Sequence, residues 1–165
     1  MIFRNLALGG ALGVLCWGSP SAAQDPYAAS ISIKSLWQAF GAYNYAACIR
    51  TTIPSVPADT ALRDRSIRAA QAACEDAPTR MFANTTMNGG PFPPRFIREA
   101  KAMAPKVDEL LLPILRSLEP SEQPLTERLE FYGQLPNGQG FVLFPEGQNS
   151  ELPDRWKFKV RLKTE

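Results

Sequence analysis

The chain has 165 residues, of which 45% are hydrophobic and 21% are charged, and its formal net charge is +2. Such a small net charge provides little long-range attraction for polyanions, so we expect no nucleic-acid partner. The sequence contains no histidine, which excludes Ser-His and Cys-His nucleophilic sites and removes the commonest zinc and copper ligand.

Residues 1–23 have the three parts of a secretory signal peptide. Arg4 precedes an apolar run from Leu6 to Trp17, and small residues follow up to Ala23. This run is shorter than the roughly 20 residues that span a bilayer, and no later stretch approaches that length. We therefore expect cleavage after Ala23 and a mature chain without a membrane span. The Ala- and Arg-rich composition favours a bacterial source, so we expect the exported chain to be in the periplasm.

Cleavage leaves Cys48 and Cys74, and an even number of cysteines in an oxidising compartment predicts one disulfide. The two residues do not form a redox C-x-x-C motif, so a structural bond is the preferred interpretation. By the chain-entropy estimate, a bond of this span contributes about 3.5 kcal/mol to stability. Both cysteines are expected near the C-terminal ends of helices, which must therefore cross steeply or lie offset along each other.

Residues 24–119 are predicted to form a helical part. Apolar side chains recur at three- and four-residue steps from Ser30 to Arg50, which indicates a first helix capped by Ser30 or Ser32. The proline-containing stretch IPSVPADT then ends this helix and connects it to the next one.

A second helix is predicted to begin at Asp59 or Thr60, either of which can cap it. It continues through ALRDRSIRAAQAACEDA, and its faces are assigned from the helical period. The residues expected to face inward are Leu62, Ala69, Ala70, Ala73 and Cys74. The residues expected to face outward are Arg63, Arg65 and Arg68.

Helical periodicity returns after Pro94, where two or three short helical pieces are expected. Pro113 should break or kink the pattern, whereas Pro105 can occupy the first turn of a new segment. The preceding stretch NTTMNGGPFPP is read as a rigid turn. An anion-binding loop before Arg95 is the weaker interpretation, because two adjacent glycines are not a specific signal.

Residues 120–165 change to aromatic and β-branched patterns, in RLEFYGQL, GFVLF and RWKFKVRLK. Asn137-Gly138 lies between the first two and favours a tight hairpin turn. We predict a three-stranded antiparallel meander that packs on the helices, so that residues 24–165 form one compact α+β domain.

The last predicted strand alternates strictly between apolar and cationic residues, so its cations share one face. One interpretation is structural: the strand lies at a solvated sheet edge, where positive charge opposes pairing with another sheet. The cations can also neutralise an acidic segment elsewhere in the chain. The other is a linear surface for anionic lipid, acidic glycan or an acidic protein. The cations are Arg155, Lys157, Lys159, Arg161 and Lys163.

Carboxylates are the remaining candidates for catalysis, since a glycosidase needs only two of them at a suitable separation. The acids considered are Glu75, Asp76, Glu99, Asp108, Glu109, Glu119, Glu122, Glu127 and Glu130. Sequence neighbours on a helix point in different directions, so solvated or charge-pairing roles are preferred and no catalytic residue is assigned.

Taken together, these patterns favour a non-enzymatic exported accessory or interaction protein of the cell envelope. The cationic strand is the candidate contact for an anionic partner, and we expect no cofactor and no metal. The alternative is a carboxylate-dependent hydrolase or lyase that acts on envelope glycan.

Overall fold

The computed structural model describes residues 30–134, 140–141 and 156–163. Three predicted features lie outside this part of the chain: the signal peptide (1–23), the Asn137-Gly138 turn and Arg155.

The described residues form helices and an antiparallel sheet, which confirms the predicted α+β class. The helices are α1 (Leu36–Thr52), α2 (Thr60–Ala73), α3 (Arg80–Asn84), α4 (Pro94–Lys101), α5 (Ala104–Ser117) and α6 (Leu125–Arg128). The strands are β1 (Ser30–Ile33), β2 (Leu129–Gln134), β3 (Gly140–Phe141) and β4 (Trp156–Leu162).

The start of the predicted first helix is wrong, because Ser30–Ile33 is strand β1. Its Ser-Ile-Ser-Ile sequence has the period of a strand, and the Ile33 side chain is buried while both serines are exposed. Helix α1 begins later, after Ser35, whose hydroxyl accepts a hydrogen bond from the Gln38 backbone N–H at 3.3 Å.

The strand order is β1-β4-β2-β3, with antiparallel pairing throughout. A meander would place β4 beside β3. Instead β4 pairs with all six residues of β2 on one side, from Leu129↔Leu162 to Gln134↔Lys157, and with β1 on the other. Within the described residues, β3 pairs with the other side of β2 at Gly133↔Phe141 and Gln134↔Gly140. Consequently β4 is central among the described strands, and its predicted edge position is wrong.

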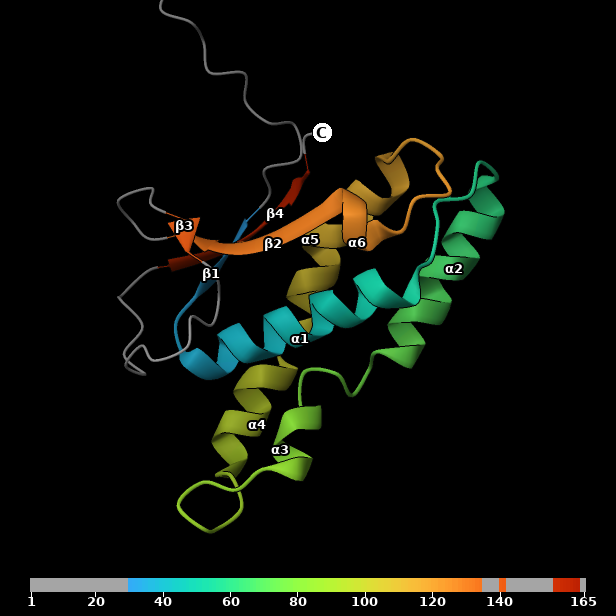
Figure 1. The fold of residues 1–165 in the computed structure, drawn as a ribbon. Coiled ribbons are helices and arrows are strands. Elements are labelled where there is room, and N and C mark those ends of the chain that lie inside the picture. Colours follow the sequence, from blue (N-terminus) through green and yellow to red (C-terminus); the bar gives the residue numbers. More distant parts are fainter. Residues whose placement is uncertain (1–29, 135–139, 142–155, 164–165) are drawn as a thin grey trace, which may run out of the picture.

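One face of the sheet is apolar and packs against helices. Figure 1 shows α1 running between the sheet and the pair α3 and α4. Side chains from β1, β2 and β4 meet those of α1 and α5 in a common core, which removes their apolar surface from water. Its members include Ile33, Ala42, Ala46, Leu111, Leu115, Leu129, Phe158 and Val160.

The predicted disulfide between Cys48 and Cys74 is present, with the two Cα atoms 5.8 Å apart. Cys48 lies one turn before the end of α1, and Cys74 caps the C-terminus of α2. Figure 1 shows α2 beginning beyond the end of α1 and approaching α1 with its C-terminal end. Helix α1 continues past Cys48 to Thr52, as the offset arrangement requires, and the disulfide joins the helices where their C-terminal regions meet.

The inward face of α2 differs from the predicted one. Ala70 and Cys74 are buried and Arg65 and Arg68 are exposed, as expected. However, Arg63 is only 9% exposed, and Ile67 is buried with it. The residues that were expected inside and are exposed are Leu62, Ala69 and Ala73.

Arg63 is buried because its guanidinium satisfies backbone carbonyls. Its Nη1 donates to the oxygens of Arg116 (2.6 Å) and Leu118 (3.0 Å), at the C-terminal end of α5. Its Nε and Nη2 donate to the Pro57 oxygen at 3.1 and 2.8 Å. The last carbonyls of a helix lack intrahelical donors, so one side chain here joins α2, α5 and the α1–α2 connection.

The region after Pro94 forms two helices, as predicted. Pro105 lies in the first turn of α5, where a missing N–H costs nothing. Pro113 lies within α5, so it does not end the helix. Because proline has no N–H, the backbone oxygen of Glu109 receives no hydrogen bond from it, and both residues are exposed to water. None of the helices in the described ranges is long and apolar enough to cross a bilayer.

Candidate functional site

The predicted cationic row lies on the face of the sheet opposite the helices. Lys157 and Arg161 are exposed, Lys159 is half-buried, and Lys163 follows the end of β4. The alternating residues Phe158 and Val160 are fully buried in the core, as the period of the strand predicts. This is the outer face of the sheet, and its cations lie on a central strand rather than at a sheet edge.

Two of these cations are held by the protein itself. Arg161 forms a 2.6 Å ion pair with Glu130 on β2, and its guanidinium lies 4.9 Å from the centre of the Tyr132 ring. The Lys163 ammonium donates to the backbone oxygen of Thr126 at 2.8 Å. Both contacts are solvent-exposed and so contribute little stability, but they orient these side chains along the sheet.

Lys157 and Lys159 have different surroundings. Their cross-strand neighbours on β1 are Ser32 and Ser30, and Lys159 also faces Tyr132 on β2. No ion pair or side-chain hydrogen bond engages either ammonium within the described residues. Among the described residues, these two positions of the row therefore carry positive charge that no ion pair compensates.

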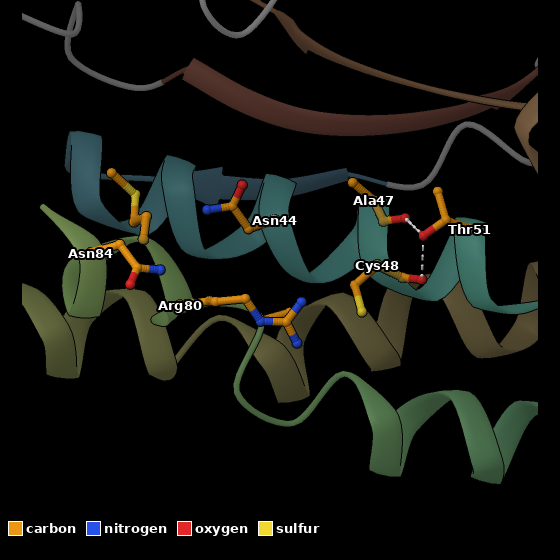
Figure 2. A pocket seen from close by; sticks show the side chains of 8 residues that line it. Asn44, Ala47, Cys48, Thr51, Arg80 and Asn84 are labelled. Carbon is orange, nitrogen blue, oxygen red and sulfur yellow. Dashed lines mark hydrogen bonds between the residues drawn. The ribbon is translucent and has the colours of Figure 1, made fainter.

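An open pocket of about 430 Å³ lies beside the disulfide, on the side of α1 that faces away from the sheet. Four of its lining residues lie at helical spacing on α1, and the others belong to α3 and to the segment before it. Figure 2 shows the Arg80 side chain extending from α3 beneath α1 toward Cys48. The lining residues are Asn44, Ala47, Cys48, Thr51, Ala77, Arg80, Met81 and Asn84.

Several polar groups of this pocket lack protein partners. The side chains of Asn44, Arg80 and Asn84 have no hydrogen bond or ion pair with any described residue. Thr51 donates its hydroxyl to the backbone oxygens of Ala47 (2.9 Å) and Cys48 (3.0 Å), so its oxygen remains free to accept. The pocket thus offers both donors and acceptors.

Sequence reasoning did not identify this pocket. Its polar residues come from two helices about 35 residues apart in the chain, and no short motif joins them. One signal was available: residues 77–98 contain no Asp or Glu but include Arg80, Arg95 and Arg98. This segment is locally positive, although Glu75, Asp76 and Glu99 flank it.

Among the candidate acids in the described part of the chain, Glu99 has a partner and two others lie at the surface. Glu99 accepts a hydrogen bond from the Ser35 hydroxyl at 2.5 Å, and Glu75 and Glu109 are exposed. The pocket beside the disulfide and a smaller one lined by Ile53, Val56 and Ile67 have no acid in their lining, and no group of three possible metal ligands occurs among the described residues. Neither of these two pockets supplies the pair of acids that a glycan hydrolase needs.

Asp108 has a structural partner. Its two carboxylate oxygens accept from the Tyr45 hydroxyl at 2.9 and 3.0 Å, and Tyr45 is 3% exposed. Burial, followed by the hydrogen bond and the negative charge of Asp108, raises the pKa of Tyr45 well above its ordinary value. This pair fixes α1 against α5.

The aromatic residues near the predicted turn form a cluster rather than a groove. Trp37 stacks on Phe96 with ring centres 4.4 Å apart and contacts Phe92 at 5.6 Å. The turn itself is closed by two backbone hydrogen bonds between Met87 and Gly90. Its two central residues, Asn88 and Gly89, have positive φ, which is typical of the tight turns that join hairpin strands.

Comparison with protein-family models, with curated proteins and with solved structures found no match for this chain. The surfaces described above are therefore the basis for assigning a function.

Proposed function

We propose that the protein is a non-enzymatic, exported accessory protein of the cell envelope that binds an anionic partner through the outer face of its sheet. Lys157 and Lys159 of β4 are the central contacts. The observation that supports this proposal is the central position of β4 in the sheet.

The strand order removes the simplest structural explanation for the cations. Lysine on an edge strand opposes association with a second sheet, but β4 already has hydrogen-bonded neighbours on both sides. Pairing within the protein accounts for Arg161 and Lys163. Within the described part of the chain, such pairing does not account for Lys157 and Lys159.

The geometry suits an extended anionic partner. Side chains two residues apart on a strand are separated by about 6.6 to 7 Å on the same face. The neighbouring serines and Tyr132 add hydroxyl donors to the two ammonium groups. An acidic protein segment or an acidic envelope component offers negative charges that can match this row.

Export is part of the proposal. Residues 1–23 have the pattern of a signal peptide, and Cys48 and Cys74 form an intramolecular disulfide, the state that an oxidising compartment maintains. These two features support export, and the Ala- and Arg-rich composition is the ground on which we propose the bacterial periplasm as the compartment.

Photocrosslinking in the cell tests the proposal. A photoreactive residue replaces Lys157, the more exposed of the two lysines, and a control variant carries it at the exposed Arg65 on α2. We expect a discrete adduct from position 157 alone. No adduct at 157 in a folded, exported protein, or the same adducts from both positions, would contradict binding through the sheet.

A further inference from the structure

One wall of the pocket beside the disulfide is α1, and the other is held against it by the disulfide and by the contact between Phe82 and Trp37. Asn44, Cys48 and Thr51 lie on one face of α1, a long helix packed into the core. The opposite wall begins at Ala77, three residues after Cys74, and the disulfide joins Cys74 to Cys48 itself. A preorganised pocket loses little conformational entropy on binding.

The charge of the pocket favours an anion. Arg80 is the only ionisable residue among its lining side chains, and its guanidinium has no partner within the described residues. A guanidinium presents parallel N–H donors that match the two oxygens of a carboxylate. A carboxylate-bearing ligand would therefore bind with its charged end at Arg80.

The other polar groups of the pocket favour a ligand that carries hydrogen-bond donors as well as a negative charge. The carboxamides of Asn44 and Asn84 each offer an acceptor as well as donors, and the Thr51 oxygen can only accept here. A simple inorganic anion without N–H groups would leave these acceptors unused. A peptide group next to the carboxylate supplies both the N–H and the C=O that carboxamides pair with.

The rest of the lining is apolar and small. Ala47, Ala77 and Met81 contribute methyl and thioether groups, which suit a short aliphatic side chain. The volume of about 430 Å³ lies in the ordinary range for small-molecule sites. We propose that this pocket binds the free C-terminal carboxylate and last peptide group of a short peptide with small apolar side chains.

Two probes that differ in one group test the inference. N-acetyl-alanyl-alanine carries the carboxylate, and its C-terminal amide has the same shape without the charge. The oxidised protein is titrated with each probe while the side-chain amide NMR signals of Asn44 and Asn84 are followed. We expect both signals to shift with the acid, and the amide to bind at least about tenfold more weakly, because it loses the charge-assisted hydrogen bonds.

Variants assign the effect to the pocket. Arg80→Gln should weaken binding of the acid by about tenfold or more, whereas Arg98→Gln, the same charge change at an exposed site on α4, should leave it within about twofold. Asn84→Ala, at the exposed end of α3, serves as a second pocket variant. Circular dichroism checks that each variant is folded.

Equal binding of the acid and the amide, an unchanged affinity in Arg80→Gln, or no shift of the Asn44 and Asn84 signals at millimolar probe would overturn the inference. A Lys157→Glu/Lys159→Glu protein should bind the acid as the wild type does, because strand β4, which carries both lysines, lies on the other side of α1 from the pocket. The inference therefore stands or fails independently of the function proposed for the sheet.

Discussion

The backbone of α1 at Gly41 lies directly against the backbone of α4 at Ala100. A Cβ atom at Gly41 would lie 2.6 Å from the Ala100 Cα and would overlap its carbonyl oxygen. Ala100 is fully buried, and neither backbone can move without separating the two helices. The glycine that interrupts the apolar pattern of the first helix is therefore what allows α1 and α4 to approach so closely.

Gly41→Ala should lower the free energy of unfolding by about 1 to 3 kcal/mol, because the added methyl group meets backbone rather than a flexible side chain. Urea denaturation followed by circular dichroism measures this change. Gly90→Ala is the matched control, since a Cβ there meets only the Met87 oxygen at 3.9 Å. Equal stability of the two variants would show that the α1–α4 contact is not tight.

Arg63→Met should destabilise the protein by about 2 to 4 kcal/mol. Methionine retains much of the side-chain volume but donates no hydrogen bonds, so the carbonyls of Pro57, Arg116 and Leu118 lose their shared donor. Arg63→Lys should recover only part of the loss, because one ammonium cannot reproduce the planar fork. The control is Arg65→Met at an exposed position, and a loss as large as that of Arg63→Met would indicate a general effect of removing charge.

Short sequence patterns predicted the features that depend on interactions between residues close together in the chain. The helical period identified most of α1. The even number of cysteines after residue 23 identified the Cys48–Cys74 bond. Pro105 was correctly placed in a first helical turn, because that position needs no N–H. Asp59 was one of the two predicted caps of α2 and accepts from the Leu62 N–H at 2.8 Å.

The errors arose where distant segments decide the outcome. Ser30 is in a strand because it pairs with Lys159, a partner more than a hundred residues away in the sequence. That same pairing moves β4 from the edge of the sheet to its interior. Arg63 is buried because carbonyls from α5 and Pro57 surround it, whereas helical periodicity alone places an arginine in solvent.

Loss of the Cys48–Cys74 bond should lower the free energy of unfolding by about 3.5 kcal/mol, since it releases a long loop in the unfolded chain. Urea unfolding with and without dithiothreitol measures the difference. The Cys48→Ala/Cys74→Ala protein should resemble the reduced wild type and should not respond to reductant. A change below about 1 kcal/mol would mean that the unfolded chain is already compact around this loop.

Stability should decline as the pH rises above 10, in part because of Tyr45. The pKa of Tyr45 is raised from 10.0 in the folded protein by burial and by Asp108, so the unfolded state loses this proton first. Below pH 10 the protonated Tyr45 makes its full contribution to the free energy of unfolding. Tyr45→Phe removes it, so the variant should be less stable at pH 8 but should lose less stability between pH 9 and 11. Tyr43→Phe on the same helix is the control, and identical slopes for wild type and Tyr45→Phe would contradict the linkage.

Reversing the charge of two lysines on β4 should prevent binding of the partner while the protein stays folded. Lys157→Glu/Lys159→Glu should abolish capture of the anionic partner, because four units of charge change in the middle of the exposed sheet face. Neither lysine has a polar side-chain partner within the described part of the chain, so the Tm should shift by only a few degrees. Arg65→Glu/Arg68→Glu makes the same change on the exposed surface of α2 and should retain capture.

If both double variants lose the partner equally, net charge is responsible. If the β4 variant loses fold and partner together, the lysines are structural.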